Sequence, residues 1–287
     1  MTPLFKKIGL AIAFSPRVEA MLAETIRLKN TWEAELVLIH VGEHGDTEKH
    51  TLNKLLSKHN LSADDVTVCW RKGKPANEIL KACKEQQIDL LVTGALRKEG
   101  LVQHYVGSIA RKILRKANCS VLTLIQPSVT PAPFDNIVVS ADDHVLTQET
   151  LRQACTFANR EHAQWLHVAR EVKLYGLSMS SADQATEEEY TQLRHKLVED
   201  EIDHVQRLLG KANHAGLKIN IKILSGKSGF ELAQFAKRKS ANLLIVSAPP
   251  RRLMLLDRIF PHDLEYVFAE LPCNLLIVNP GKEHAHG

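Results

Sequence analysis

The sequence lacks any long apolar run. No stretch approaches the roughly 20 consecutive apolar residues that a transmembrane helix requires. The first residues, MTPLFKK, contain neither the apolar core nor the cleavage site of a secretory signal peptide. Hydrophobic residues make up 44% of the chain and charged residues 24%, which is the balance of a folded globular protein. We therefore predict a cytoplasmic protein without a membrane partner.

Clustered metal ligands and catalytic motifs are also absent. The five cysteines form no CxxC pair and are expected to be buried thiols, and no HxxxH or HExxH pair lies on a predicted helix. The segment Gly226-Lys227-Ser228 is similar to the end of a P-loop, but Ile221 stands where that motif requires a glycine. The sequence thus predicts no metal site, no catalytic residue and no enzymatic activity, and it identifies no ligand for magnesium.

The sequence also lacks a strong excess of charge of one sign. The net charge is +4 and aromatic residues make up 5% of the chain, so the basic footprint of a nucleic-acid binder is lacking. The charge is divided unevenly. Residues 1–128 contain 19 lysines and arginines against 13 acids (+6), and residues 129–287 contain 18 against 20 (−2). We predict no nucleic-acid partner and a preference for small anions in the first half.

The chain contains the same pattern twice. Each half has an apolar run, a second run ending in His-Val, a Gly-Lys turn, a further apolar run, and a closing run after a cysteine. The paired landmarks are residues 7–13 and 136–142, 37–41 and 165–168, 73–78 and 226–231, 89–94 and 242–247, and 118–122 and 272–276. Pro127, Pro131 and Pro133 punctuate the link between them. We predict two homologous domains, residues 1–128 and residues 129–287.

Both halves alternate strand-like runs with amphipathic stretches, which is typical of a parallel sheet covered by helices. Strands are predicted near 7–13, 35–41, 65–71, 89–94, 120–126, 136–142, 163–169, 217–225, 242–247 and 274–279. Helices are predicted near 17–30, 46–59, 76–87, 108–117, 147–161, 185–214, 229–239 and 262–271. Runs such as Leu90-Leu91-Val92 are apolar on both faces, as a doubly covered sheet requires. The predicted fold class is α/β, with two repeated doubly wound domains of five parallel strands each.

The helix predicted over 185–214 is much longer than its counterpart in the first half. Its apolar residues predict a helix packed on the surface, or a contact with the other domain or another subunit.

The loop after the fourth strand of the first half is the strongest candidate site. Gly94 ends the strand and Gly107-Ser108 begins the next helix, so the free N–H groups of that helix, from Ile109 on, would face an anion. The Ser108 hydroxyl would contact a phosphate or cap the helix, and Arg97 would add positive charge. Ligands of open α/β sheets bind at this place, where the strand order reverses. An ordinary connection with a serine N-cap is the alternative.

These residues resemble the universal stress protein family, whose ATP-binding members carry a Gly-x2-Gly-x9-Gly-Ser/Thr loop. Gly94, Gly107 and Ser108 match that spacing, and Arg97 stands at the second glycine. Further matching landmarks are His40-Val41, Gly73-Lys74-Pro75, Asp89-Leu90-Leu91-Val92 and Cys119-Ser120-Val121-Leu122. The resemblance covers both halves and points to the tandem-domain members of the family.

The resemblance implies the strand order 3-2-1-4-5 in each domain and pairing of the two domains through their fifth strands within the chain. Two chains could then associate further as a homodimer. It also implies ATP or AMP as the ligand of the first domain, with Ser15 and Val41 lining the adenosine side.

Departures from the family pattern leave a second hypothesis open. ATP-binding members have an aspartate at the end of the first strand, where this chain has Ala13. The second half keeps the aspartate as Asp142, but its loop contains Pro249-Pro250 and no Gly-Ser pair, so its phosphate-binding residues are missing. The apolar run 253–256 in that loop predicts a contact with a partner or collapse into the emptied pocket.

Two functions therefore remain. The first is a stress-response protein that binds ATP or AMP through a degenerate loop in the first domain, without catalysis. The second is a structural or interaction protein of the same fold that binds no nucleotide. Arg97 distinguishes them, because its side chain either fills the phosphate pocket or pairs with a phosphate.

Overall fold

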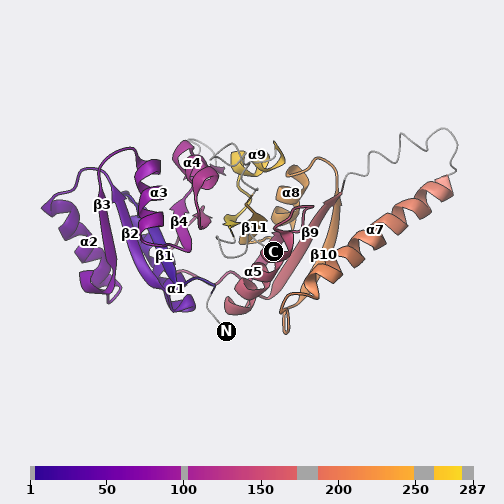
Figure 1. The fold of residues 1–287 in the computed structure, drawn as a ribbon, viewed down its shortest axis with the longest axis horizontal. Helices are drawn as coiled ribbons and strands as arrows, with labels where there is room; N and C mark the ends of the chain where they lie inside the picture. The colour runs from indigo at the N-terminus through magenta and orange to yellow at the C-terminus, as the bar shows by residue number, and fades with distance from the viewer. Residues whose placement is uncertain (1–3, 98–102, 173–186, 249–261, 280–287) are drawn as a thin grey trace.

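The computed structural model describes residues 4–97, 103–172, 187–248 and 262–279. Ten strands form one continuous sheet, in the order β10-β9-β8-β11-β12-β7-β4-β1-β2-β3 (Figure 1). The strands are β1 (Lys7–Ile12), β2 (Glu35–Val41), β3 (Thr67–Arg71), β4 (Leu90–Gly94), β7 (Ser120–Leu124), β8 (Asn136–Ser140), β9 (Trp165–Val172), β10 (Ile219–Ser225), β11 (Leu243–Ser247) and β12 (Asn274–Val278). Each half has the order 3-2-1-4-5, and all pairings within a half are parallel, so the predicted α/β fold is confirmed.

Helices cover both faces of the sheet. They are α1 (Val18–Trp32), α2 (Asp46–Lys58), α3 (Pro75–Glu85), α4 (Ser108–Lys116), α5 (Thr147–Arg160), α7 (Glu187–Leu209), α8 (Phe230–Arg238) and α9 (His262–Ala269), with a short 3-10 helix η1 (Ala63–Asp65). The apolar residues of α1, α2, α5 and α7 form one core cluster, and those of α3, α4, α8 and α9 form the other. No helix in the described ranges is long and apolar enough to span a membrane.

The two halves join through their fifth strands, as the resemblance implied. β12 pairs with β7 in antiparallel fashion, with Leu276 opposite Leu122. Polar side chains extend the junction at both ends. The Asn274 Oδ1 atom accepts a hydrogen bond from the Ile125 N–H (2.9 Å), and the Ser120 hydroxyl accepts one from the Asn279 N–H (3.1 Å). The domains of this chain thus satisfy each other's edge strands.

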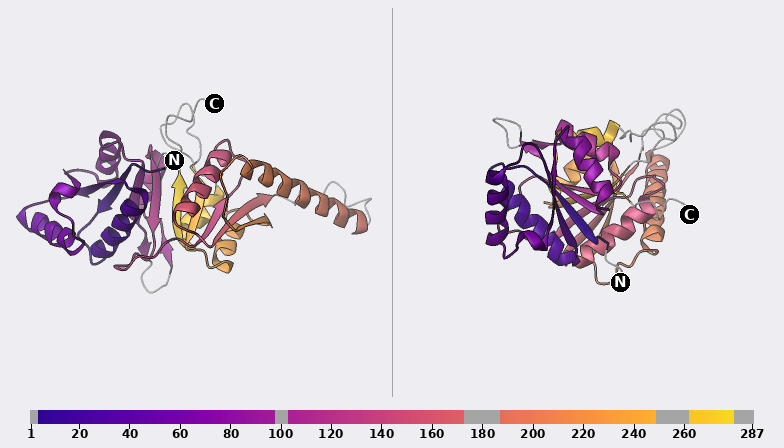
Figure 2. Two further views of the ribbon diagram at one scale, coloured as in Figure 1. Left: turned by 90° about the horizontal axis from the view of Figure 1, so that it is seen from below. Right: turned by 60° about the vertical axis from the view of Figure 1, so that its left-hand side comes forward.

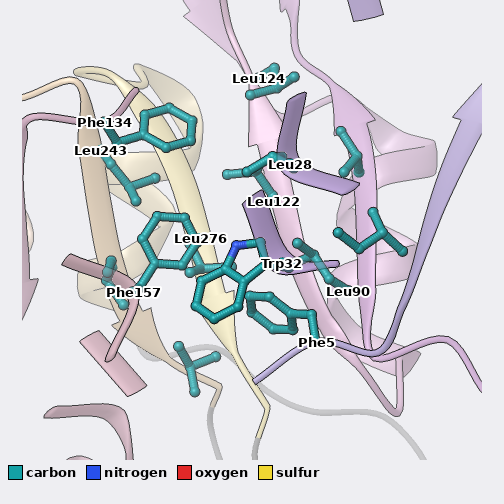
Figure 3. Packing of buried hydrophobic residues seen from close by; sticks show 14 of the residues in the cluster. Phe5, Leu28, Trp32, Leu90, Leu122, Leu124, Phe134, Phe157, Leu243 and Leu276 are labelled. Atoms are coloured by element: carbon teal, nitrogen blue, oxygen red, sulfur yellow. The ribbon is translucent and has the colours of Figure 1, made fainter. Parts of the chain in front are cut away.

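Aromatic side chains fill the core on one side of this junction (Figure 3). The ring of Trp32 lies 5.1 Å from that of Phe5 and 5.6 Å from that of Phe157, and Phe134 packs 5.9 Å from Phe157. Phe5 and Trp32 come from the first half, whereas Phe134 and Phe157 come from the second. The two halves therefore share one continuous apolar core rather than two separate ones.

A buried ion pair crosses the same boundary. The Arg27 guanidinium lies 2.7 Å from a carboxylate oxygen of Glu161, which also accepts a hydrogen bond from the Phe134 N–H (2.9 Å). Glu161 is 2% exposed. The Arg27 guanidinium also lies 5.1 Å above the ring of Phe134.

The element boundaries match the sequence prediction closely, and two short strands were not predicted. β5 (Leu96–Arg97) and β6 (His104–Tyr105) pair in antiparallel fashion within the candidate loop. The division of the domains at residue 128 remains a prediction. The loop containing residues 253–256 lies outside the described residues.

The long helix α7 spans 23 residues against 13 in its counterpart α2. Its C-terminal part is packed on the body, where Val205 and Leu209 are buried. The helix extends beyond the edge of the sheet at its other end (Figure 2).

Candidate anion site

The candidate site lies at the carboxyl ends of β1, β4 and β7, where the strand order reverses. Ser15 follows β1 and Gly94 ends β4, so the parallel sheet brings two segments that are distant in sequence to the same edge. Both residues are exposed there. The Ser15 N–H donates to the Ala13 carbonyl (2.8 Å), which closes the turn that leads into α1.

The loop between β4 and α4 is folded back on itself. Arg97 in β5 stands opposite His104 in β6. Leu96 packs over Gly107, because a Cβ atom built on Gly107 would lie only 2.5 Å from the Leu96 Cδ1 atom. Any larger residue at position 107 would therefore displace Leu96, which explains the glycine at the end of the loop.

Gly107, and not a serine, is the N-cap of α4. Its φ of −70° and ψ of 170° are extended, and no side chain caps the helix. Ser108 is the first helical residue, so the alternative of a serine N-cap is wrong. The first intrahelical bond runs from the Arg111 N–H to the Gly107 carbonyl (2.8 Å), and no described residue accepts from the N–H groups of Ser108 or Ile109. The positive end of α4 is therefore available to an anion.

Arg17 is the site residue that the sequence did not reveal. Its guanidinium donates to the carbonyl of Ala95 (2.9 Å), directly after β4, and to that of Ile125 (2.7 Å), directly after β7. Within the described ranges, no carboxylate pairs with it. Burial lowers the pKa of Arg17, because desolvation disfavours its charge. The only signal in the sequence was a basic residue between the first strand and the first helix.

His104 adds a third basic group beside Arg17 and Arg97. The ring is buried, and the pKa of His104 is lowered by desolvation first and then by the charges of Arg17 and Arg97. The two smaller causes show that the charges of Arg17 and Arg97 reach the His104 ring, so all three basic groups lie near one another.

Aromatic rings lie near the end of β2, where the resemblance implies the adenosine side of a site. Val41 ends β2 there and is half-buried. The rings of Phe14 and Trp70 are stacked with their centroids 6.4 Å apart, and His44 stacks on Trp70 at 5.1 Å. The His40 ring lies against both, with its centroid 5.0 Å from that of Phe14 and 5.4 Å from that of Trp70. A nucleotide base would therefore meet aromatic faces, with no aspartate nearby in β1 to bind the ribose.

The second half holds the candidate loop in place. The Val106 N–H donates to the Phe268 carbonyl and the Leu271 N–H donates to the His104 carbonyl, both at 2.9 Å. Arg111 forms an ion pair with Glu265 of α9. Contacts with the second half therefore help to position the N-terminal end of α4.

The corresponding edge of the second half is closed by its own side chains. The Ser247 hydroxyl, at the position of Gly94, bonds the Thr150 hydroxyl (2.8 Å). Arg170 bridges Asp143 (3.3 Å) and Glu201 (2.9 Å). The expectation that the phosphate-binding residues are missing from the second half stays a prediction, because residues 249–261 lie outside the described part of the chain.

Comparison with known proteins identifies the family. A model of the universal stress protein family matches residues 4–124 and, a second time, residues 133–279. The chain belongs to the universal stress protein family. Universal stress protein YxiE of Bacillus subtilis is 26% identical over 145 residues, which is 98% of that protein and 42% of this chain.

Solved universal stress protein structures share the two-domain extent. One from Archaeoglobus fulgidus is 15% identical, with a TM-score of 0.67, and the alignment covers 96% of this chain and 98% of that one. A functionally unknown protein, PA1789, from Pseudomonas aeruginosa is 16% identical with a TM-score of 0.70, covering 96% and 92%. At these identities the likeness shows the fold alone. It supports the duplication predicted from the sequence.

Proposed function

We propose that the first domain of this universal stress protein binds ATP or AMP through its phosphate groups, and that the protein acts in a stress response as a binding module without catalysis. The observation that carries this proposal is Arg17. A half-buried guanidinium, bonded among the described residues to two neutral carbonyls and to no carboxylate, lies beside the candidate loop. Such a charge favours an anionic ligand, because a buried charge is costly unless it is paired.

The phosphate end fits an anion in three independent ways. The N–H groups of Ser108 and Ile109 have no described acceptor, the dipole of α4 is positive at this end, and Arg17 and Arg97 lie on the same edge. A phosphate would accept hydrogen bonds from those N–H groups. Gly107 adds no side chain of its own at this end of α4, where Leu96 already packs against it.

The aromatic rings near the end of β2 would make fewer specific contacts with the nucleotide than the phosphate-binding groups would. Trp70 and His44 are half-buried, so a base would stack on their accessible faces. Without an aspartate at Ala13, the ribose would gain no charged acceptor. We therefore expect affinity to depend on phosphate contacts more than on the base.

The absence of catalysis is part of the proposal. Across the described ranges no three His, Cys, Asp or Glu residues are grouped as a metal site. His104, a titratable residue of the loop, has a buried side chain, and its backbone carbonyl accepts a hydrogen bond from the Leu271 N–H of the second half. Domain 1 would sense a nucleotide rather than hydrolyse it.

A second candidate function, an interaction protein that binds no nucleotide, is favoured by one observation. The rings of Phe14, His40, His44 and Trp70 already contact one another, as they would if they filled the base pocket permanently.

Calorimetric titration with ATP, AMP and inorganic pyrophosphate tests the proposal. We expect ATP and pyrophosphate to bind the wild type. Arg17→Met should weaken both by about tenfold or more, because a hydrogen bond to a charged group contributes about 1.5–3 kcal/mol. Arg238→Met, the same substitution on the exposed surface of α8, is the matched control and should leave binding unchanged.

Arg97→Gly separates the two functions. If Arg97 pairs with phosphate, the variant binds more weakly than the wild type. Absence of heat and of any thermal shift for the wild type, with binding restored by Arg97→Gly, would show that the arginine fills the pocket and would favour the interaction protein.

A further inference from the structure

The outer edge of the second domain carries a groove that the proposed nucleotide site does not use. It lies between α7 and the edge strand β10, has a volume of about 580 Å³, and is lined on its apolar side by Ile202, Leu209, Leu217, Ile219 and Ile221. β10 is the last strand of the ten-stranded sheet, so no strand of the described residues pairs with its outer side. Figure 1 shows α7 running alongside this strand.

The edge of β10 presents unused backbone groups to the groove. The Leu166 N–H of β9 donates to the Lys218 carbonyl, so the even-numbered residues of this segment turn their backbone groups towards β9. Ile219, Ile221 and Ile223 therefore direct theirs outwards. No described residue bonds these N–H and C=O groups. A seven-residue strand with a free edge is a template for one further strand.

The helix side of the groove is acidic. Glu199 and Asp203 are one turn apart on α7, on the row next to Ile202 and Gln206, which line the groove. Both are exposed, and among the described residues their carboxylates have no ion-pair or hydrogen-bond partner. A chain entering the groove would meet apolar side chains at the base and, on the adjoining row of α7, the carboxylates of Glu199 and Asp203, with Arg207 one turn beyond Asp203.

We propose that this groove binds an extended segment of another protein as an additional strand on β10, with apolar and basic residues alternating on the face that meets α7. Backbone groups of the segment would pair with the free edge, its apolar side chains would contact Ile219 and Ile221, and its lysines or arginines would reach Glu199 and Asp203. A second copy of this chain fits less well. In an antiparallel β10–β10 pair, Lys222 at the centre of the strand would face its own copy.

The probe is a fluorescein-labelled peptide, Val-Thr-Lys-Thr-Val-Thr-Lys-Thr-Val, measured by fluorescence anisotropy with the full chain. Saturable binding is expected, weakening as salt is raised because the rim charges are screened. The same peptide with glutamate in place of lysine, and one with proline in place of threonine, should not bind, since the first lacks the cations and the second lacks strand donors.

Two single variants of α7 provide the matched comparison. Asp203→Asn should weaken the binding of the lysine peptide by about two- to fivefold, which is the range that one exposed charge pair contributes. Glu188→Gln removes the same charge from the same helix about four turns before Asp203, outside the lining of the groove, and should have no effect. Peptide binding should also slow amide hydrogen exchange at Ile221 and Ile223, whose N–H groups face the free edge.

Equal binding of the lysine and glutamate peptides, or no saturable binding, would overturn the proposal. A chain that is dimeric in light scattering, with Ile221 and Ile223 already protected from exchange before peptide is added, would assign the edge to a second copy and overturn it as well. ATP has no part in these measurements, so their outcome is independent of the first domain's function.

Discussion

The ion pair between Arg27 and Glu161 should couple the two domains, and its removal makes a quantitative prediction. Glu161→Ala would remove the nearer partner of the Arg27 guanidinium, leaving the Glu24 carboxylate 3.9 Å away, and would leave the Phe134 N–H without an acceptor. The side chain of Arg27 is only 14% exposed, so water would solvate it poorly. Breaking a buried pair on one side costs about 3–5 kcal/mol, and we expect the free energy of unfolding to fall by that amount.

Removing both partners should cost much less than the sum of the single changes. The pair is incompletely hydrogen-bonded, because the Nε and one terminal nitrogen of Arg27 and one oxygen of Glu161 have no hydrogen-bond partner. An incompletely bonded pair gains little over an apolar replacement. A cycle of Arg27→Met, Glu161→Gln and the double variant should therefore show a coupling energy of about 1–3 kcal/mol. Glutamine is used in this cycle because its amide oxygen can still accept from the Phe134 N–H.

Urea unfolding, followed by both circular dichroism and tryptophan fluorescence, measures this cycle. Coincident transitions in the two signals are required for the free energies to be comparable. The exposed pair Arg160–Glu33, at 2.6 Å across the same boundary, is the control and should contribute less than about 1 kcal/mol. Single changes at Arg27 and Glu161 that simply add, within about 0.5 kcal/mol, would refute the reasoning.

Three further predictions concern the core and the second domain. Gly9→Ala places a Cβ atom 2.6 Å from the Ile88 Cδ1 atom, and the overpacking should lower stability by about 1–3 kcal/mol in urea; an unchanged midpoint would contradict it. Burial raises the pKa of Cys273 to about 12, and all five cysteines are buried, so a colorimetric thiol reagent at pH 8 should label the native protein negligibly and five thiols in urea. Burial, the largest influence, raises the pKa of Glu171 above 4.5, so the folded state binds its proton more tightly than the unfolded state. The stability of the wild type relative to Glu171→Gln should thus be greatest below about pH 4.5 and decline as the pH rises through the raised pKa, and a difference that grows with pH would show the opposite sign.

Local patterns in the sequence were sufficient to predict most helices and strands of this protein. Apolar runs such as Leu90-Leu91-Val92 have the length and two-sided burial of central strands, and the strands and helices of both halves lie close to the predicted ranges. Duplication strengthened the prediction, because each element had a counterpart against which it could be compared. The pair β5 and β6 was missed, since each has two residues and no periodic pattern.

The candidate site was predictable only in part. Gly94, Gly107 and Ser108 could be identified from their spacing, because the glycine–helix connection is local. The geometry of the helix cap could not be predicted from this spacing: Gly107, and not Ser108, is the N-cap of α4.

What the sequence by itself determined is the class of each segment, the repeat and the family, because these depend on residue type at short range. Only the tertiary structure decided which charges and edges meet. Arg17 reaches carbonyls 78 and 108 residues away, and the candidate loop is held by α9 of the other domain. The groove beside β10 likewise exists because α7 crosses an edge strand. Contacts at such separations are set by how the sheet orders its strands, and no periodicity along the chain records that order.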